Sequence, residues 1–237
     1  MKIACFSELI KPCCQRILAK PGKISYGFLW GSASHRFNLD TLRTVLRDNA
    51  KVILCEDGFL RSATTWCDDK VDTKYKKSCS FTTDTHAHYF DAVNVSDIEK
   101  MLNDEKLVLA DEQLTESRNL INIITRLKLS KYNHQPIYKP EIGSPNRKKV
   151  LVVDQSYGDF SVRRGLAGDA TFTKMLDRAI SENPGCDILV KTHPDTMTGN
   201  AGGYYQKIKD DRVIKVTFPI NPYSLLEIVD KVYVCCT

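Results

Sequence analysis

Apolar residues recur along the chain at helix-like and strand-like spacings, with polar segments between them. In the first half, residues 38–50 form an apolar helical face that runs directly into an apolar strand at 51–55. Residues 96–99 read as a capping box that opens a short helix, and 111–129 carry apolar residues at helical spacing. A short apolar strand after a helix favours a buried parallel sheet. We therefore predict an α/β domain over residues 1–136.

The alternation becomes more regular in the second half. Strands are predicted at 150–153, 187–191, 213–216 and 232–236, and helices around 172–180 and 222–229. A β-α-β alternation predicts a parallel, Rossmann-like sheet, here over residues 148–237. Residues 135–149 collect prolines, glycine and serine, which is typical of a linker between domains.

Composition narrows the class of protein. The chain has 237 residues, of which 42% are hydrophobic and 27% charged, which excludes a disordered polypeptide. Its net charge is +5, but no run of basic residues is long enough to follow a nucleic-acid backbone, so we expect no nucleic-acid partner. No segment approaches the ~20 apolar residues of a membrane span. We expect a cytoplasmic protein that is soluble or peripheral on a membrane.

Cysteine and histidine provide little sign of a metal site. The nine cysteines include no C-x-x-C pair and are expected to be reduced thiols. His86 and His88 form an H-x-H pair, but the sequence places no third ligand beside it. We therefore expect no metal.

Three polar clusters follow predicted strands directly, at 56–62, 154–159 and 191–195. The paired carboxylates of the first could supply a nucleophile, a base or an acid, the second suits a hydroxyl-rich ligand, and the lysine and histidine of the third can hold a phosphate. Each also has a structural interpretation: an acidic turn with a solvated arginine, an Asx or ST turn before a helix, and a hydrogen-bonded histidine in a tight turn.

Taken together, the motifs resemble a known family. Glu56-Asp57-Gly58 with Lys191-Thr192-His193-Pro194 resembles the acidic-Gly and His-Pro motifs of bacterial CMP-sugar transferases. The fuller match, from about residue 25 to the end, is to the capsular-polysaccharide β-Kdo transferases of the KpsC type. The matching segments are Glu-Asp-Gly-Phe-Leu-Arg-Ser at 56–62, Leu-Ser-Lys-Tyr-Asn at 129–133, Val-Leu-Val-Val-Asp-Gln-Ser-Tyr-Gly-Asp at 150–159, Lys-Thr-His-Pro-Asp at 191–195 and Ser-Leu-Leu-Glu-Ile-Val-Asp-Lys-Val-Tyr-Val at 224–234.

The resemblance implies a GT-B-like pair of Rossmann-like domains whose three clusters face one cleft. It implies retaining transfer of Kdo, a 3-deoxy sugar acid, from CMP-β-Kdo, with Asp159 as the nucleophile and Glu56 or Asp57 as the acid/base near the acceptor. Lys191 and His193 would hold the CMP phosphate as cations in place of a metal. Further residues expected to bind the donor are Gln155, Ser156, Gly158, Arg61 and Ser62.

The implied partners are a CMP-sugar donor and a glycolipid or oligosaccharide acceptor, with peripheral contact to the inner membrane or to capsule-assembly proteins. Two alternatives stay open: a transferase for another CMP-activated sugar acid such as sialic acid, and a non-catalytic binding module of a capsule-assembly complex. Family members continue past the final strand with a Ser-Gln turn and a helix that complete the nucleotide pocket. Since the sequence stops at Thr237, we expect a truncated protein or a fragment of a longer one.

Overall fold

The computed structural model describes residues 3–5, 25–30, 43, 45–65, 70–208 and 210–236. Most of the predicted helix at 38–50 therefore lies outside the described residues, as does Thr237. The chain forms two compact units. Unit 1 consists of Met1–Arg61 and Lys77–Leu120, and unit 2 of Ser62–Lys76 and Ile121–Thr237. Unit 2 thus takes in segments that the sequence analysis assigned to the first domain and the linker. The domain limits of 1–136 and 148–237 stay a prediction.

Unit 1 is built on a four-stranded sheet in the order β1-β2-β3-β4. Strands β1 (Ile3–Cys5), β2 (Tyr26–Trp30) and β3 (Lys51–Asp57) are parallel, and β4 (Phe81–Asp84) pairs antiparallel with β3. Strand β3 runs two residues beyond its predicted end, because the ladder with β4 continues to the last residue of β3. The two carboxylates predicted to follow the strand are therefore its last two residues.

Two helices of this part of the chain were predicted. Ser96 caps helix α3 (Asp97–Leu102) by accepting a hydrogen bond from the backbone N–H of Glu99 at 3.1 Å. Helix α4 (Asp111–Arg126) begins where predicted and ends three residues earlier. None of its residues is buried. Among the described residues, every helix is too short or too polar to span a lipid bilayer.

Unit 2 is a fully parallel sheet in the order β7-β6-β5-β8. Strands β5 (Lys149–Val153), β6 (Asp187–Lys191) and β7 (Val213–Val216) agree with the predicted limits to within one residue, whereas β8 (Lys231–Tyr233) is shorter than predicted. The α/β fold with Rossmann-like parallel pairing is thereby confirmed. The helices of unit 2 are α5 (Phe160–Arg164), α6 (Asp169–Glu182), α7 (Pro194–Met197) and α8 (Pro222–Leu226), with a short 3-10 helix at Thr73–Lys76.

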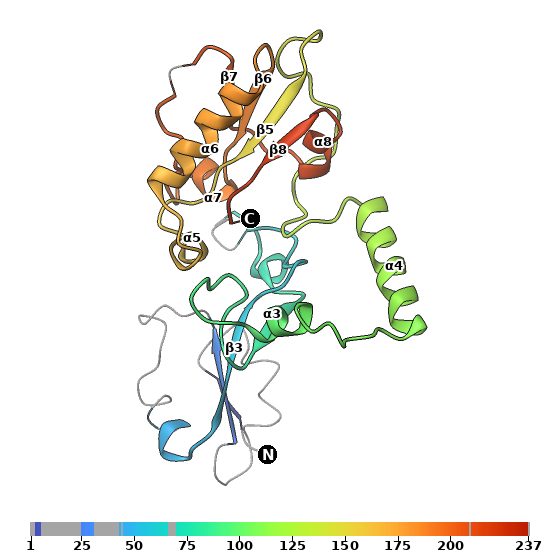
Figure 1. Cartoon of the computed structure of the whole chain (residues 1–237), viewed down its shortest axis with the longest axis vertical. Helices are drawn as coiled ribbons and strands as arrows, with labels where there is room; N and C mark the ends of the chain where they lie inside the picture. Colours follow the sequence, from blue (N-terminus) through green and yellow to red (C-terminus); the bar gives the residue numbers. More distant parts are fainter. Residues whose placement is uncertain are drawn as a thin grey trace. The chain divides into compact units, whose positions relative to one another are not determined.

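Both faces of the second sheet are covered, which explains why its central strands are continuously apolar. Val152 and Val190 pack with Phe172 of helix α6 on one face. Leu151 and Leu189 pack on the other face with Leu225 of helix α8. Helices α5 and α7 lie beyond the C-terminal ends of β5 and β6, as Figure 1 shows. The parallel strands therefore bring their following loops to one edge of the sheet, next to the point between β5 and β8 where the strand order reverses.

Candidate functional site

The C-terminal edge of the second sheet brings two of the three predicted clusters together. Val153 of β5 lies opposite Lys191 of β6, so the residues that follow each strand start side by side. The Oγ of Ser156 lies 2.9 Å from the Nδ1 of His193, and the N–H of Asp154 donates to the carbonyl of Lys191 at 3.0 Å. The clusters at 154–159 and 191–195 therefore form one polar site within unit 2.

His193 is at once a helix cap and a site residue. It is the N-cap of α7, and its Nδ1 accepts a hydrogen bond from the backbone N–H of Asp195 at 3.2 Å. Burial lowers the pKa of His193, against the opposing charges of Asp195 and Asp159. Because Nδ1 accepts, the neutral ring carries its proton on Nε2. At neutral pH the site thus has a neutral N–H donor here, and the cationic histidine expected from the sequence is not favoured.

Lys191 also loses its proton more readily than an ordinary lysine. Its Nζ donates to the carbonyl of Thr192 at 2.9 Å and lies 3.7 Å from the Sδ of Met197. Burial lowers the pKa of Lys191 to about 8. The ammonium is therefore only partly protonated at mildly alkaline pH.

Asp159 is the exposed carboxylate of this edge. It caps helix α5: its Oδ1 accepts from the backbone N–H of Ser161 at 2.8 Å and from the Ser161 hydroxyl at 2.7 Å. Its charge reaches His193, whose pKa it raises. Oδ2 is thus the Asp159 oxygen with no hydrogen bond among the described residues, and a carboxylate held this way could attack an electrophile near His193.

Two other predicted donor-binding residues, Gln155 and Gly158, make contacts that hold the backbone around the site. The side chain of Gln155 is buried, and its Oε1 accepts from the backbone N–H of Cys236 at 3.2 Å, which ties β5 to the segment after β8. Gly158 has a φ of 76°, a conformation that favours glycine, and its N–H donates to the hydroxyl of Tyr204 at 3.3 Å. Their roles in donor binding stay predictions.

A pocket of about 370 Å³ opens beside this site and was not predicted. One of its walls is the connection at 202–206, which folds back so that Gly203 pairs with Ser156. A Cβ at Gly203 would lie 2.2 Å from the Oδ2 of Asp154, so a larger residue would clash with this buried carboxylate. In the sequence, only the glycines at 199, 202 and 203 indicate that the chain could fold back closely here and form the wall of a pocket. The pocket is lined by Asp154, Thr192, Thr196, Met197, Gly203, Tyr205, Gln206, Lys215 and Thr217.

The first predicted cluster belongs mostly to unit 1, and its two carboxylates are not equivalent. Glu56 and Asp57 are consecutive residues of β3, so their side chains point to opposite faces of the sheet. Asp57 accepts from the Nε of the buried Arg61 at 3.1 and 3.2 Å. The Oε1 of Glu56 accepts the backbone N–H of Asp57 at 3.1 Å. The Asp57–Arg61 pair is therefore a structural contact, which makes Glu56 the better candidate for proton transfer.

Ser62 is the first residue of unit 2 and is buried. Its hydroxyl donates to the carbonyl of Thr64 at 2.7 Å, and its N–H donates to the carbonyl of Lys131 at 3.2 Å. Both contacts hold the chain in place. The predicted donor-binding roles of Arg61 and Ser62 have no support in these contacts and stay predictions.

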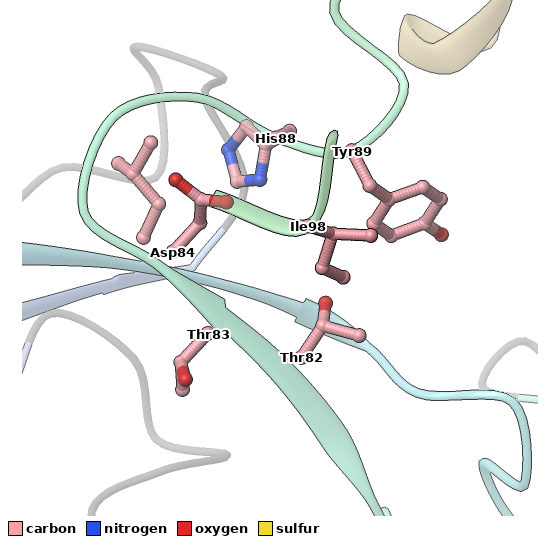
Figure 2. A pocket seen from close by; sticks show the side chains of 7 residues that line it. Thr82, Thr83, Asp84, His88, Tyr89 and Ile98 are labelled. Atoms are coloured by element: carbon pink, nitrogen blue, oxygen red, sulfur yellow. The ribbon is translucent and has the colours of Figure 1, made fainter. Parts of the chain in front are cut away.

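A second small cavity, of about 10 Å³, lies in unit 1 between β4 and α3. Figure 2 shows His88, Tyr89 and Ile98 around it with Asp84. The Nε2 of His88 is buried and has no hydrogen-bond partner among the described residues. The cavity has room for about one water molecule.

His86, the first residue of the H-x-H pair, has carboxylate neighbours in the structure. One ligand atom from each of Asp84, His86 and Asp97 lies within 4.8 Å of the others. Asp84 accepts the backbone N–H groups of His86, Ala87 and Asp97 at 2.6–2.9 Å, and the Nδ1 of His86 lies 2.6 Å from Asp97. These hydrogen bonds fix the connection between β4 and α3. The expectation that the protein binds no metal stays a prediction.

Known proteins resemble this chain over most of its length. Residues 139–237 match the family described as capsule polysaccharide biosynthesis protein. The chain is 36% identical over 189 residues to the capsule polysaccharide modification protein LipA of Neisseria meningitidis, and 28% identical over 184 residues to the lipopolysaccharide-processing protein LpsZ of Rhizobium meliloti. These matches cover 78% and 75% of this chain. The chain spans 26% of the length of LipA and 40% of that of LpsZ.

A solved structure also matches nearly the whole chain. KpsC of Thermosulfurimonas dismutans, a β-Kdo 2,4 transferase, superimposes with a TM-score of 0.81 at 30% sequence identity. The match covers 98% of this chain and 73% of that one. At this coverage the match includes both units, and it supports the GT-B-like architecture expected from the motifs.

Proposed function

This chain belongs to the KpsC-type family of capsule polysaccharide Kdo transferases, and on that premise we propose that it moves Kdo from CMP-β-Kdo to a glycolipid or oligosaccharide acceptor with retention of the β configuration. The observation that carries the proposal is the polar site of unit 2. There, His193 contacts Ser156 and is within electrostatic reach of Asp159. A hydrogen-bond donor and a carboxylate at one sheet edge are what a glycosyl transfer through a covalent intermediate needs.

The first step is departure of CMP. The Nε2–H of His193 and the ammonium of Lys191 bind the donor phosphate, on which negative charge grows as the bond to the sugar breaks. A carboxylate oxygen of Asp159 attacks the anomeric carbon from the opposite face and forms a glycosyl-enzyme ester, while the bonding electron pair leaves with the phosphate oxygen.

The second step restores the configuration. An acceptor hydroxyl attacks the same carbon, Asp159 leaves as a carboxylate, and the hydroxyl proton passes to a base. We assign this base to Glu56, because Asp57 is engaged with the buried Arg61. Action at the cytoplasmic membrane face, with the acceptor supplied there, is part of the same proposal. No metal is required in this scheme, since protein donors bind the single phosphate.

The experiment that tests the proposal is a transfer assay with CMP-β-Kdo and a Kdo-terminated glycolipid. Wild-type protein should extend the acceptor with a β-linked Kdo, and Asp159→Asn should abolish this while Asp177→Asn, at an exposed position on α6, should not. Mass spectrometry should find a trapped Kdo adduct on the peptide that contains Asp159. An adduct on the 56–62 peptide, or full activity of Asp159→Asn, would contradict the assignment.

A further inference from the structure

The pocket of unit 2 has the size of a small-molecule site and adjoins the proposed phosphate site. Its volume of about 370 Å³ falls in the range of about 300–1,000 Å³ that is typical of ligand pockets. Two of its lining residues contact Lys191, whose Nζ donates to the carbonyl of Thr192 at 2.9 Å and lies 3.7 Å from the Sδ of Met197. A ligand whose phosphate is bound at Lys191 can therefore extend into the pocket.

The strand order places much of the pocket on the side away from the proposed nucleophile. Asp159 follows β5, and His193 follows the neighbouring strand β6. Lys215 is a residue of β7 and Thr217 follows it, and β7 lies on the side of β6 opposite β5. In a CMP-sugar the phosphate joins the sugar to the nucleoside, and the anomeric carbon must lie next to Asp159 to react. With the phosphate at His193, the nucleoside then extends toward β7.

The polar groups of the lining suit a ligand that has hydroxyls and hydrogen-bond acceptors. The N–H of Thr192 donates to the carbonyl of Val216 at 3.2 Å, which continues the pairing of β6 with β7 and sets Thr192 beside Thr217. Within the described part of the chain, the hydroxyls of these two threonines make no hydrogen bond. The Nζ of Lys215 donates to the carbonyl of Gln206 at 2.7 Å, which uses one of its three donors. Two hydroxyls and an ammonium are therefore available to a ligand.

The other lining residues form the walls of the pocket. Among the described lining residues, Asp154 is the only carboxylate, and its Oδ1 accepts two backbone N–H groups at 2.9 and 3.0 Å. The hydroxyl of Tyr205 donates to the carbonyl of Phe172 at 2.8 Å, so it is engaged in the core. Met197 adds a flexible apolar surface, which suits the face of a planar base.

We propose that this pocket holds the cytidine of the donor, with the ammonium of Lys215 and the hydroxyls of Thr192 and Thr217 as its polar contacts. The inference rests on the proposed function, in which CMP-β-Kdo is the donor. Cytosine offers a carbonyl oxygen and a ring nitrogen as acceptors for the ammonium, and the ribose hydroxyls can exchange hydrogen bonds with those of the threonines. The sugar acid lies at the other end of the phosphate, next to Asp159.

Methyl NMR of the full chain with labelled methionines tests the proposal. Cytidine has neither phosphate nor sugar acid, so it probes the pocket by itself. The chain has four methionines, of which Met197 lines the pocket and Met101 lies on α3 of unit 1. Cytidine and CMP should both shift the methyl signal of Met197 and leave that of Met101 in place. Free Kdo should shift neither signal.

A variant that fills the pocket gives an independent measurement. Thr217 is exposed and lines the pocket, so the ring of Thr217→Trp should occupy space that the ligand needs. Calorimetry should show cytidine and CMP binding weakened about tenfold or more. Thr173→Trp, at an exposed position on α6, is the matched control and should change neither affinity.

The outcomes separate this inference from the proposed function. If the wild type binds CMP while the Met197 signal stays in place, or if Thr217→Trp keeps full affinity for CMP, the inference alone is overturned. A Met197 shift with free Kdo and not with cytidine would put the sugar acid in the pocket and overturn it as well. A wild-type protein that binds no CMP would overturn the proposed function, and with it this role of the pocket.

Discussion

Single side chains at the edge of the second sheet have properties that their residue types alone do not indicate. The Nδ1 of His193 caps a helix, which leaves Nε2 as the proton-bearing nitrogen. Lys191 is the last residue of a buried strand, and its ammonium loses much of its hydration there. Both effects follow from contacts within a few ångströms, and each leads to a measurable consequence at one residue.

Replacing Lys191 should reveal the free-energy cost of burying its charge. We expect Lys191→Met to stabilise the fold by about 1–2 kcal/mol at pH 7, because methionine fills similar volume without a charge, and to weaken CMP binding. The pKa of Lys191 is lowered from 10.5 to about 8, so between these values the unfolded chain binds the proton that the native chain lacks. Wild-type stability should therefore gain a favourable contribution as pH rises from 8 to 10.5.

Urea unfolding at pH 7 and pH 10 measures both effects. Below about pH 8 the lysine is charged in both states and the full penalty applies, whereas above 10.5 it is neutral in both and the penalty is absent. Lys191→Met should lack this gain, and Lys174→Met, at an exposed position, should keep it. A variant that is less stable than the wild type at pH 7 would refute the assigned penalty.

His193 should contribute mainly to phosphate binding, and Asp159 mainly to the covalent step. His193→Ala should weaken CMP binding about tenfold, since a hydrogen bond to a charged group is lost. Asp159→Asn should bind CMP nearly as tightly as the wild type, because the carboxylate contributes mainly during the reaction. Calorimetry of both variants decides this, and equal affinities for the wild type and His193→Ala would remove the phosphate assignment.

At the scale of elements, the short helices of unit 2 share one design. Helices α5, α7 and α8 each begin at a side chain that accepts an N–H from two residues further on: Asp159, His193 and Asn221. Two of these three caps are candidate site residues. The structural and the functional interpretations of the strand-end clusters are therefore compatible, since the hydrogen bond that starts a helix also orients the reactive group.

Replacing Asn221 tests how much one helix cap contributes to the stability of the protein and to CMP binding. Its Oδ1 caps α8, its Nδ2 holds the carbonyl of Lys128, and its side chain is buried. Asn221→Ala should destabilise the protein by about 2 kcal/mol and weaken CMP binding severalfold, because the chain around Lys128 loses its anchor on α8. Thermal unfolding and calorimetry measure the two effects, and Asn119→Ala, at an exposed position of α4, should show neither. Unchanged stability in Asn221→Ala would contradict its role as an anchor.

At the scale of the whole molecule, the proposed nucleophile and the proposed base are assigned to different units. Asp159 belongs to unit 2 and Glu56 to unit 1. Glu56→Gln should leave CMP affinity and stability close to wild type and reduce transfer at least a hundredfold, as loss of a general base does. Asp57→Asn should instead cost about 3 kcal/mol of stability, because it removes one member of the ion pair with the buried Arg61.

Transfer assays together with chemical unfolding distinguish the two carboxylates. If Asp57→Asn remains stable and loses transfer while Glu56→Gln stays active, the roles of the two residues are reversed. Loss of stability in Glu56→Gln would indicate that this side chain also supports the fold.

Local features of this protein were determined by its sequence. The central strands of unit 2, the Ser96 cap and the start of α4 depend on apolar spacing and on neighbours within a few residues, so the predictions agree with the structure. The grouping of polar clusters at strand ends likewise follows from the parallel order of β5 and β6. The helices α5 and α7 escaped prediction because each is only about one turn long and has too few residues to show a period.

The tertiary structure alone decided the chemical state and partners of the site residues. Ser156 and His193 are 37 positions apart, and their contact depends on how separate segments pack. The antiparallel pairing with β4 places Glu56 and Asp57 inside strand β3. There the contact with Arg61 involves Asp57 and not Glu56, and this difference is the basis for assigning them different roles. Burial by the packed sheet lowers the pKa values of Lys191 and His193, and it depends on segments distant in sequence, whereas the hydrogen bond that fixes the tautomer of His193 comes from Asp195, two residues on.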